Sequence, residues 1–191
     1  MSESNTPRRN LLVGAAAVIA GGAGAGLAWY RQRPAPAQPQ ATQAASAPVT
    51  DAAAGFWAAR FERPLGGAEL VAASLRGKPL LLNFWASWCA PCVKELPELA
   101  QFQRDFKAAG WQVLGLAIDS PDPVREFLQK MPLDFELGMA GPNGTELSRN
   151  LGNSQGGLPF SVAFDARGDV VWRKLGATHL QELREMATRI T

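Results

Sequence analysis

The chain has 191 residues, 47% of them hydrophobic and 19% charged, which is the composition of an ordinary globular protein. Its 19 basic and 17 acidic residues give a net charge of +2 with no block of like charge, which argues against a nucleic-acid partner. Two cysteines are too few for a small secreted scaffold held together by several disulfides, so that class is excluded.

An uncharged run occupies residues 11–30, after a polar segment, 1–10, that contains a double arginine. Its length suits a helix that crosses a bilayer, which takes about 20 residues. Trp29 and Tyr30 stand where an interfacial aromatic belt would lie. We therefore expect a transmembrane anchor with a cytoplasmic segment before it and the rest of the chain exported. The many glycine and alanine residues leave a second interpretation open, in which the run is a cleaved export signal.

Residues 31–54 are rich in proline, alanine and glutamine and show no apolar period. Such a segment buries too little surface to offset its ordering entropy, so we expect an extended tether. The folded domain is predicted to begin at Gly55 and to span residues 55–191.

The rest of the chain alternates between strand and helix patterns. Short apolar runs indicate buried strands, whereas apolar residues at helical spacing indicate helices. A turn at 166–168 between two apolar runs indicates a hairpin, and Thr178 is the expected N-cap of the last helix. The predicted elements are a strand at 79–85, a helix at 93–109, a strand at 111–119, a helix at 121–131, a short helix at 145–151, a hairpin at 160–176 and a helix at 179–190.

This order predicts an α/β fold in which a central mixed sheet carries helices on both faces. Both cysteines, Cys89 and Cys92 in "WCAPC", fall where the first strand passes into its helix. A cysteine at a helix N-terminus faces free backbone N–H groups that stabilise its thiolate, so Cys89 is the expected nucleophile. Cys92 is close enough to attack the mixed disulfide, and Pro91 suits the first helical turn.

Other chemistries of the pair fit less well. A structural zinc needs four ligands, and the chain offers only the two cysteines and the distant His179. Covalent haem attachment needs a histidine after the second cysteine, where Val93 stands. A purely structural bridge across so short a loop would remove little unfolded-state entropy. A redox-active pair is the preferred interpretation.

The stretch "NFWASWCAPC", with Glu95 and Pro97 after it and "GLPFSVAFD" and "RGDVV" later, resembles the thioredoxin-fold proteins. Within them it is similar to the membrane-tethered TlpA/ResA-type disulfide reductases, over roughly Phe61 to Ile190. The resemblance implies a thioredoxin-like fold and thiol–disulfide exchange on the outer face of the bacterial cytoplasmic membrane. It also implies a place in cytochrome c maturation or in the reduction of copper-site assembly proteins.

Position by position, the resemblance makes Cys89 the nucleophile and Cys92 the resolving cysteine. Pro159 matches the cis-proline that faces the disulfide, with an ordinary trans proline as the alternative. Leu158 would then offer backbone groups to an extended substrate segment, which would add to it as a strand does.

Glu95 matches an acidic residue of the TlpA/ResA group that tunes the pKa of the pair or passes protons. A solvated carboxylate on the helix surface is the alternative. Asn83 stands where thioredoxin has a buried aspartate, so Glu95 is the nearest candidate in the sequence to take the proton of Cys92. Trp88 and Pro91 are expected at the substrate-binding surface.

The preferred function is a periplasm-facing protein disulfide reductase that is recharged by a membrane thiol donor and acts on protein disulfides. Pro91, rather than a histidine, precedes Cys92 and favours the reducing direction. No cofactor beyond the redox-active disulfide and no metal are expected. Two alternatives stay open: a dithiol module that binds Cu(I), and a peroxidase of the peroxiredoxin type, although Ala86 stands where those enzymes carry threonine. A cleaved signal would leave a soluble periplasmic protein.

Overall fold

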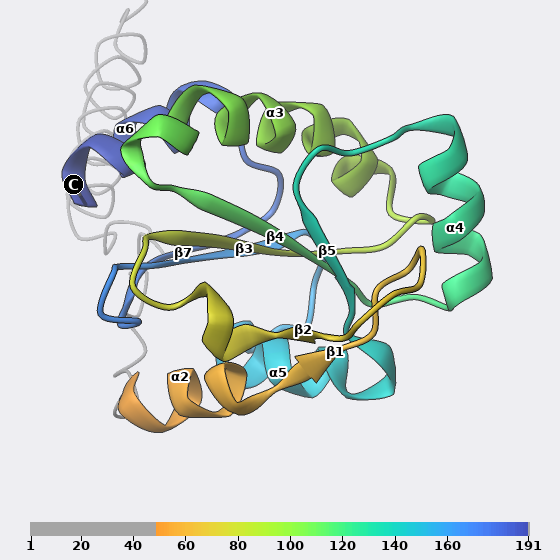
Figure 1. Ribbon diagram of the computed structural model, residues 1–191, viewed down its shortest axis with the longest axis horizontal. Coiled ribbons are helices and arrows are strands. Elements are labelled where there is room, and N and C mark those ends of the chain that lie inside the picture. Colours follow the sequence, from red (N-terminus) through yellow and green to blue (C-terminus); the bar gives the residue numbers. More distant parts are fainter. Residues whose placement is uncertain (1–48, 191) are drawn as a thin grey trace, which may run out of the picture. The chain divides into compact units, whose positions relative to one another are not determined.

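The computed structural model describes residues 49–190 (Figure 1). The predicted anchor at 11–30 and most of the predicted tether lie outside these residues. The helices are α2 Val49–Ala58, α3 Ala90–Phe106, α4 Pro121–Lys130, α5 Gly144–Asn150 and α6 Leu180–Ile190, and the 3-10 turns are Ala72–Leu75, Lys107–Ala109 and Gly141–Asn143. The strands are β1 Arg60–Phe61, β2 Leu70–Val71, β3 Leu80–Trp85, β4 Gln112–Ala117, β5 Glu136–Met139, β6 Phe160–Phe164 and β7 Val170–Leu175.

The central sheet has the strand order β5-β4-β3-β6-β7. Strands β3, β4 and β5 run parallel, whereas β6 and β7 pair antiparallel to their neighbours. The mixed sheet predicted from the sequence is confirmed, and so is the hairpin formed by β6 and β7. Because β3 lies in the middle, its C-terminal end is fixed from both sides, and this end carries the two cysteines.

Alternate residues of β3 enter two different core layers, because side chains along a strand point to opposite faces. Leu81 and Trp85 pack among residues of α3, α4 and α6, whereas Leu80, Leu82 and Phe84 pack toward α2. Figure 1 shows α3 and α6 over one face of the sheet and α2 and α5 over the other. All six residues of β3 are buried, which explains why five of them are apolar; the sixth, Asn83, forms hydrogen bonds in the core.

A helix that the sequence did not predict, α2, begins within the segment predicted as tether. Residues 49–54, predicted as the end of the tether, form the first turns of α2. Phe56 stacks on Phe164 with ring centroids 5.0 Å apart, and the Trp57 indole donates a hydrogen bond of 2.9 Å to the Gly168 carbonyl. Alanine-rich sequence has high helix propensity, so the helix extends upstream from these two anchors. The division of the preceding residues into segment, anchor and tether stays a prediction.

Within residues 49–190, no helix is both long and apolar enough to span a bilayer. The predicted span at 11–30 precedes this part of the chain.

Candidate active site

The cysteine pair occupies the junction between β3 and α3. Cys89 is the N-cap of α3 and Cys92 lies in its first turn, and the two form a disulfide with Cα atoms 5.2 Å apart. The Cys92 backbone N–H points at the Cys89 sulfur, 3.3 Å away. This donor, together with the helix N-terminus, stabilises negative charge on Cys89 once the bond is reduced. Cys89 is 6% exposed and Cys92 fully buried, so an incoming sulfur meets Cys89.

A carboxylate from the neighbouring strand holds the loop before Cys89. Asp119, just beyond β4, accepts hydrogen bonds from the Ser87 backbone N–H at 2.9 Å and the Ser87 hydroxyl at 2.6 Å. Its other oxygen accepts from the Ser120 N–H at 2.7 Å. The Cys89 N–H donates to the Ala86 carbonyl at 3.2 Å and closes the turn. The position of the nucleophile therefore depends on a contact between the loops that follow β3 and β4, which the sequence did not reveal.

A groove of about 520 Å³ opens over the disulfide. Trp88, which is 70% exposed, stands at this groove. The groove brings together three of the predicted binding residues, Trp88, Pro91 and Leu158, and their role in binding stays a prediction. Its lining consists of Trp88, Cys89, Ala90, Pro91, Ile118, Thr145, Gly156, Gly157 and Leu158.

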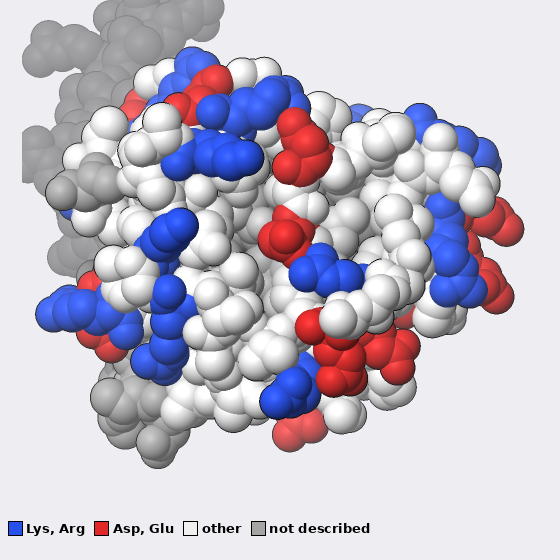
Figure 2. Space-filling model, in the orientation of Figure 1, with Lys and Arg blue, Asp and Glu red and all other residues white. Residues whose placement is uncertain are grey.

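A second hollow, of about 740 Å³, shares Trp88 and Ile118 with the groove. Its lining includes Arg60, Glu62 and Glu69, from the segment that forms β1 and β2. Figure 2 shows acidic side chains gathered beside these two strands. The surface next to the disulfide is thus apolar on one side of Trp88 and carries carboxylates on the other.

The peptide bond between Leu158 and Pro159 is cis, as the resemblance implied. Pro159 is buried, and its carbonyl accepts a hydrogen bond of 2.8 Å from the Gly176 N–H at the end of β7. Within residues 49–190 the backbone N–H and carbonyl of Leu158 bond to no other group. They are therefore free to pair with an extended segment at the groove.

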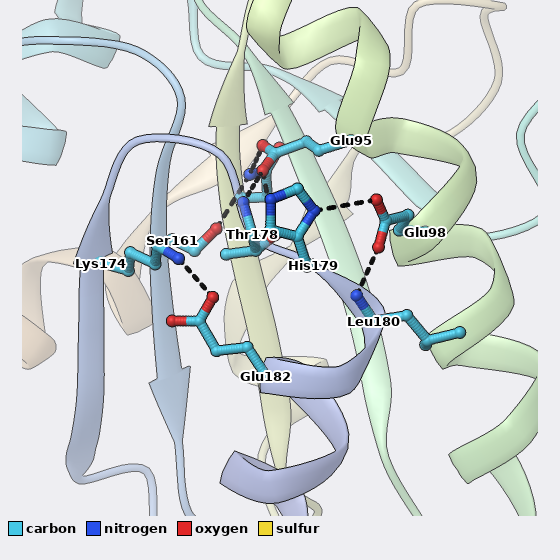
Figure 3. A network of polar contacts seen from close by, with 9 residues as sticks. Glu95, Glu98, Ser161, Lys174, Thr178, His179, Leu180 and Glu182 are labelled. Atoms are coloured by element: carbon cyan, nitrogen blue, oxygen red, sulfur yellow. Dashed lines mark hydrogen bonds and ion pairs between the residues drawn. The ribbon is translucent and has the colours of Figure 1, made fainter.

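Glu95 is buried, with only 1% of its surface exposed, one turn of α3 beyond Cys92. Its carboxylate accepts three hydrogen bonds (Figure 3). The donors are the Asn83 side-chain amide at 2.7 Å, the Thr178 N–H at 2.6 Å and the Thr178 hydroxyl at 2.9 Å. Burial raises the pKa of Glu95 above its ordinary value of 4.5, although these hydrogen bonds and the charge of Lys174 oppose the rise. The alternative of a solvated surface carboxylate is wrong.

The start of α6 is held by α3. We expected Thr178 to cap α6, but the helix begins at Leu180, and Thr178 donates to Glu95 instead. The Leu180 N–H, a free donor at the N-terminus, donates to the Glu98 carboxylate, whose other oxygen lies 3.2 Å from the His179 ring (Figure 3). The hydrogen bond from Leu180 lowers the pKa of Glu98. His179, for which no partner was predicted, thus faces Glu98.

Comparison with protein families matches residues 44–190 to the family described as Redoxin. The chain belongs to the Redoxin family. The match includes every helix and strand from α2 to α6.

Two sequence relatives of this Redoxin protein carry names that describe an activity. The thiol:disulfide interchange protein HelX of Rhodobacter capsulatus is 35% identical over 168 residues, 83% of this chain and 82% of HelX. The thiol-disulfide oxidoreductase ResA of Bacillus cereus is 30% identical over 128 residues, 66% of this chain and 72% of ResA. A solved thiol:disulfide interchange protein from Chlorobium tepidum has a TM-score of 0.60 and 26% identity, covering 69% of this chain and 92% of that chain.

This Redoxin domain is therefore a thiol–disulfide oxidoreductase of the TlpA/ResA type, with the thioredoxin-like fold that the sequence predicted. The structure places Cys89, Cys92, Pro91, Trp88, Leu158 and Pro159 around one site, with Glu95 buried behind it in α3. Among the residues described, no group of three or more His, Cys, Asp or Glu side chains is arranged to hold a metal ion.

Sequence reasoning missed the residues that support this site: Ser87, Asp119, Asn153, Ser161 and Thr178. Most act through a hydrogen bond to a partner on another element or loop, such as the 2.6 Å bond from the Ser87 hydroxyl to Asp119, whereas Asn153 bonds within its own loop, 2.9 Å to the Gly157 carbonyl. Only Asp119 had a signal in the sequence, because it follows a strand predicted to lie in the sheet. The C-terminal ends of parallel strands meet at one edge of a sheet, so an acidic residue there is expected near the active site.

Proposed function

We propose that this protein is a membrane-anchored, periplasm-facing reductase of protein disulfides. The observation that carries the proposal is the buried carboxylate of Glu95, one turn beyond Cys92 and bonded to Asn83. A disulfide that served only as a staple would need no proton acceptor inside the core. Burying a carboxylate costs free energy unless it is well paired, so its presence beside a cysteine pair indicates proton transfer.

The reaction begins with the reduced pair. The Cys89 thiolate attacks one sulfur of the substrate disulfide, that S–S bond breaks, and the departing substrate sulfur takes up a proton. Cys92 then gives its proton to Glu95 and attacks the Cys89 sulfur. The mixed disulfide breaks, the second substrate thiol leaves protonated, and the Cys89–Cys92 disulfide remains. Two electrons have passed to the substrate.

Glu95 serves this sequence because its pKa is raised toward the range in which a carboxylate can accept and return a proton. Asn83 cannot titrate, so it orients the carboxylate without competing for the proton. Its second bond, 3.0 Å to the Ser161 hydroxyl, ties this arrangement to β6.

The direction of electron flow is assigned to reduction, supported by Pro91 before Cys92, whereas the names of ResA and HelX describe thiol–disulfide exchange without a direction. A membrane dithiol donor would recharge the disulfide by the same steps in reverse. The uncharged run at 11–30 would anchor the domain, with its cleavage as the alternative. The substrates proposed are disulfides formed during cytochrome c maturation or copper-site assembly.

The test of direction is the reduction potential of the pair in the full chain, held in detergent and equilibrated with glutathione or dithiothreitol buffers. We expect a value near or below that of thioredoxin, about −270 mV. A value near about −120 mV, typical of a strong periplasmic oxidant, would contradict a reductase. Copper titration of the same reduced sample separates the Cu(I)-binding alternative, which predicts stoichiometric binding without turnover.

The test of Glu95 compares Glu95→Gln with Glu126→Gln, a control on the exposed surface of α4. Without a proton acceptor the resolving step should slow by about tenfold to a hundredfold. The mixed disulfide at Cys89 should therefore accumulate in Glu95→Gln and be visible by mass spectrometry of acid-quenched samples. Equal accumulation in both variants would remove Glu95 from the mechanism.

A further inference from the structure

The loop between α5 and β6 forms one wall of the groove over the disulfide. Its residues Gly156, Gly157 and Leu158 line the groove, and Thr145 of α5 lines it as well. A loop that must pair with a substrate backbone has to hold its free groups in one position before the substrate arrives. The contacts that hold this loop in place therefore affect substrate binding.

Asn153 connects the loop to α5. The residue is 2% exposed. Its side-chain NH₂ donates hydrogen bonds to the Gly157 carbonyl at 2.9 Å and to the Ser148 hydroxyl at 3.3 Å. The Ser148 hydroxyl donates in turn to the Thr145 carbonyl at 2.8 Å. One continuous chain of hydrogen bonds thus joins Thr145 to Gly157, two residues that both line the groove.

The backbone of Asn153 closes the same loop from within. Its N–H donates to the Ser148 carbonyl at 3.0 Å, and its carbonyl accepts from the Gly156 N–H at 3.0 Å. Gly156 has a φ of +66°, a conformation that residues with a Cβ rarely adopt. The loop therefore wraps around Asn153 with both its main chain and its side chain engaged.

The side-chain carbonyl oxygen of Asn153 is buried and has no hydrogen-bond partner within residues 49–190. A buried, unpaired acceptor lowers stability. The amide group is oriented by its two acceptors, the Gly157 carbonyl at the groove wall and the buried Ser148 hydroxyl, which indicates that holding Gly157 is its role.

We propose that Asn153 is the positioning residue of the substrate-binding loop, holding Gly157 and Leu158 where they pair with an extended segment of the partner protein. This inference rests on the proposed reaction with protein disulfides. The partner segment is a polypeptide strand, because the free groups are the Leu158 backbone N–H and carbonyl. A small disulfide without a backbone gains nothing from this loop, so Asn153 should distinguish the two kinds of substrate.

The experiment uses the reduced full chain with two probes. One is 5,5′-dithiobis(2-nitrobenzoate), and the other is a cysteine peptide of about ten residues joined to one thionitrobenzoate, long enough to form a strand. Attack by Cys89 on the peptide sulfur forms the mixed disulfide and releases thionitrobenzoate. Asn153→Ala is compared with Asn150→Ala, which removes an exposed asparagine at the end of α5 and serves as the matched control.

We expect Asn153→Ala to react with the peptide about tenfold more slowly, through a higher half-saturating concentration and an unchanged limiting rate. Its rate with the small probe and its pH profile should equal those of the wild type. Equal peptide rates in Asn153→Ala and wild type would overturn the proposal. An equal loss with both probes would also overturn it, because Cys89 itself would then be affected. Failure of the wild type to react with the small probe would instead contradict the proposed function.

A second variant guards against misfolding. Ser148→Ala removes one hydroxyl from the hydrogen-bond chain and leaves the bond from Asn153 to Gly157 in place, so a smaller loss with the peptide alone is expected. Amide hydrogen exchange provides a direct readout, since residues 152–158 should exchange faster in Asn153→Ala while β3 is unchanged. Unchanged exchange in this loop would contradict the positioning role.

Discussion

Glu95 is subject to two opposing influences on its carboxyl group. Burial disfavours the charged form, whereas three hydrogen bonds and the charge of Lys174 favour it. Burial is the larger influence, so the pKa is raised and the folded protein holds this proton more tightly than the unfolded chain does. The contribution of Glu95 to stability is therefore full below its ordinary value of 4.5 and is lost as the pH rises through the raised pKa.

The raised pKa of Glu95 predicts how Glu95→Gln changes the pH dependence of unfolding. The glutamine cannot titrate, so the free energy of unfolding of the wild type minus that of the variant should decrease as the pH rises above 4.5. Urea titrations at a series of pH values measure the difference. The exposed control Glu126→Gln should show no such decrease. A difference that grows with pH would mean that the hydrogen bonds outweigh burial.

Ser87 allows a second test at the level of one side chain. Ser87→Ala removes the hydroxyl that lies 2.6 Å from Asp119, while the backbone bond stays. Losing a hydrogen bond to a charged acceptor should lower the free energy of unfolding by about 1 to 2 kcal/mol. Ser87→Thr retains the hydroxyl and should stay close to wild type in urea denaturation. Similar losses in both variants would assign the effect to packing.

The sequence identified the reactive residues because each belongs to a short motif. Cys89 and Cys92 were recognisable from "WCAPC" alone, whereas the cis proline Pro159 was expected only through the family resemblance of "GLPF". The supporting contacts were not recognisable, since Thr178 meets Glu95 across 83 positions and Ser87 meets Asp119 across 32. Such pairs become neighbours only through the strand order of the sheet, which a single sequence does not specify.

At the level of elements, α3 carries the cysteine pair at its beginning and anchors α6 through Glu95 and Glu98. At the N-terminus of α6 the Leu180 N–H donates to Glu98, and the Thr178 N–H, just before the helix, donates to Glu95. The active-site helix and the last helix therefore share polar contacts in addition to their apolar packing.

Glu98→Ala should lower the free energy of unfolding by about 1 kcal/mol, the usual effect of losing a capping side chain. Glu126→Ala, on the exposed face of α4, makes the same change in helix propensity and serves as the control. Chemical denaturation at neutral pH measures both. Because the pKa of Glu98 is lowered, its contribution is present above 4.5 and should disappear as the pH falls through the lowered value. Equal stability of the two variants at neutral pH would show that Glu98 does not cap α6.

Elements with a clear period were predictable, and very short ones were not. The mostly apolar sequences of β3 and β4 and the turn between β6 and β7 marked these strands. β1 and β2 have two residues each, and β5 has four, which is too short for alternation to stand out. The N-cap of α6 was misplaced because Thr178 has a stronger partner in Glu95.

For the whole molecule, the residue at which a shortened chain begins affects stability. A chain that begins at Gly55 lacks residues 49–54 of α2, whereas one that begins at residue 44, where the Redoxin match starts, retains the helix. Short helices are marginal, so the shorter chain should hold Phe56 less firmly. We expect its thermal midpoint to lie lower by about 3 to 6 °C, measured by circular dichroism. Equal midpoints would show that residues 49–54 contribute nothing to folding.

The burial of Cys92 behind Cys89 has a kinetic consequence. With one sulfur within reach of solvent, the protein that delivers electrons and the protein that receives them must occupy the same place at different times. Each partner must dissociate before the other binds, so the rate of reduction by the donor and the rate of substrate reduction together limit turnover. Steady-state turnover should accordingly give parallel lines in double-reciprocal plots. A large excess of either the donor or the substrate should inhibit turnover, because it competes with the other partner for the site.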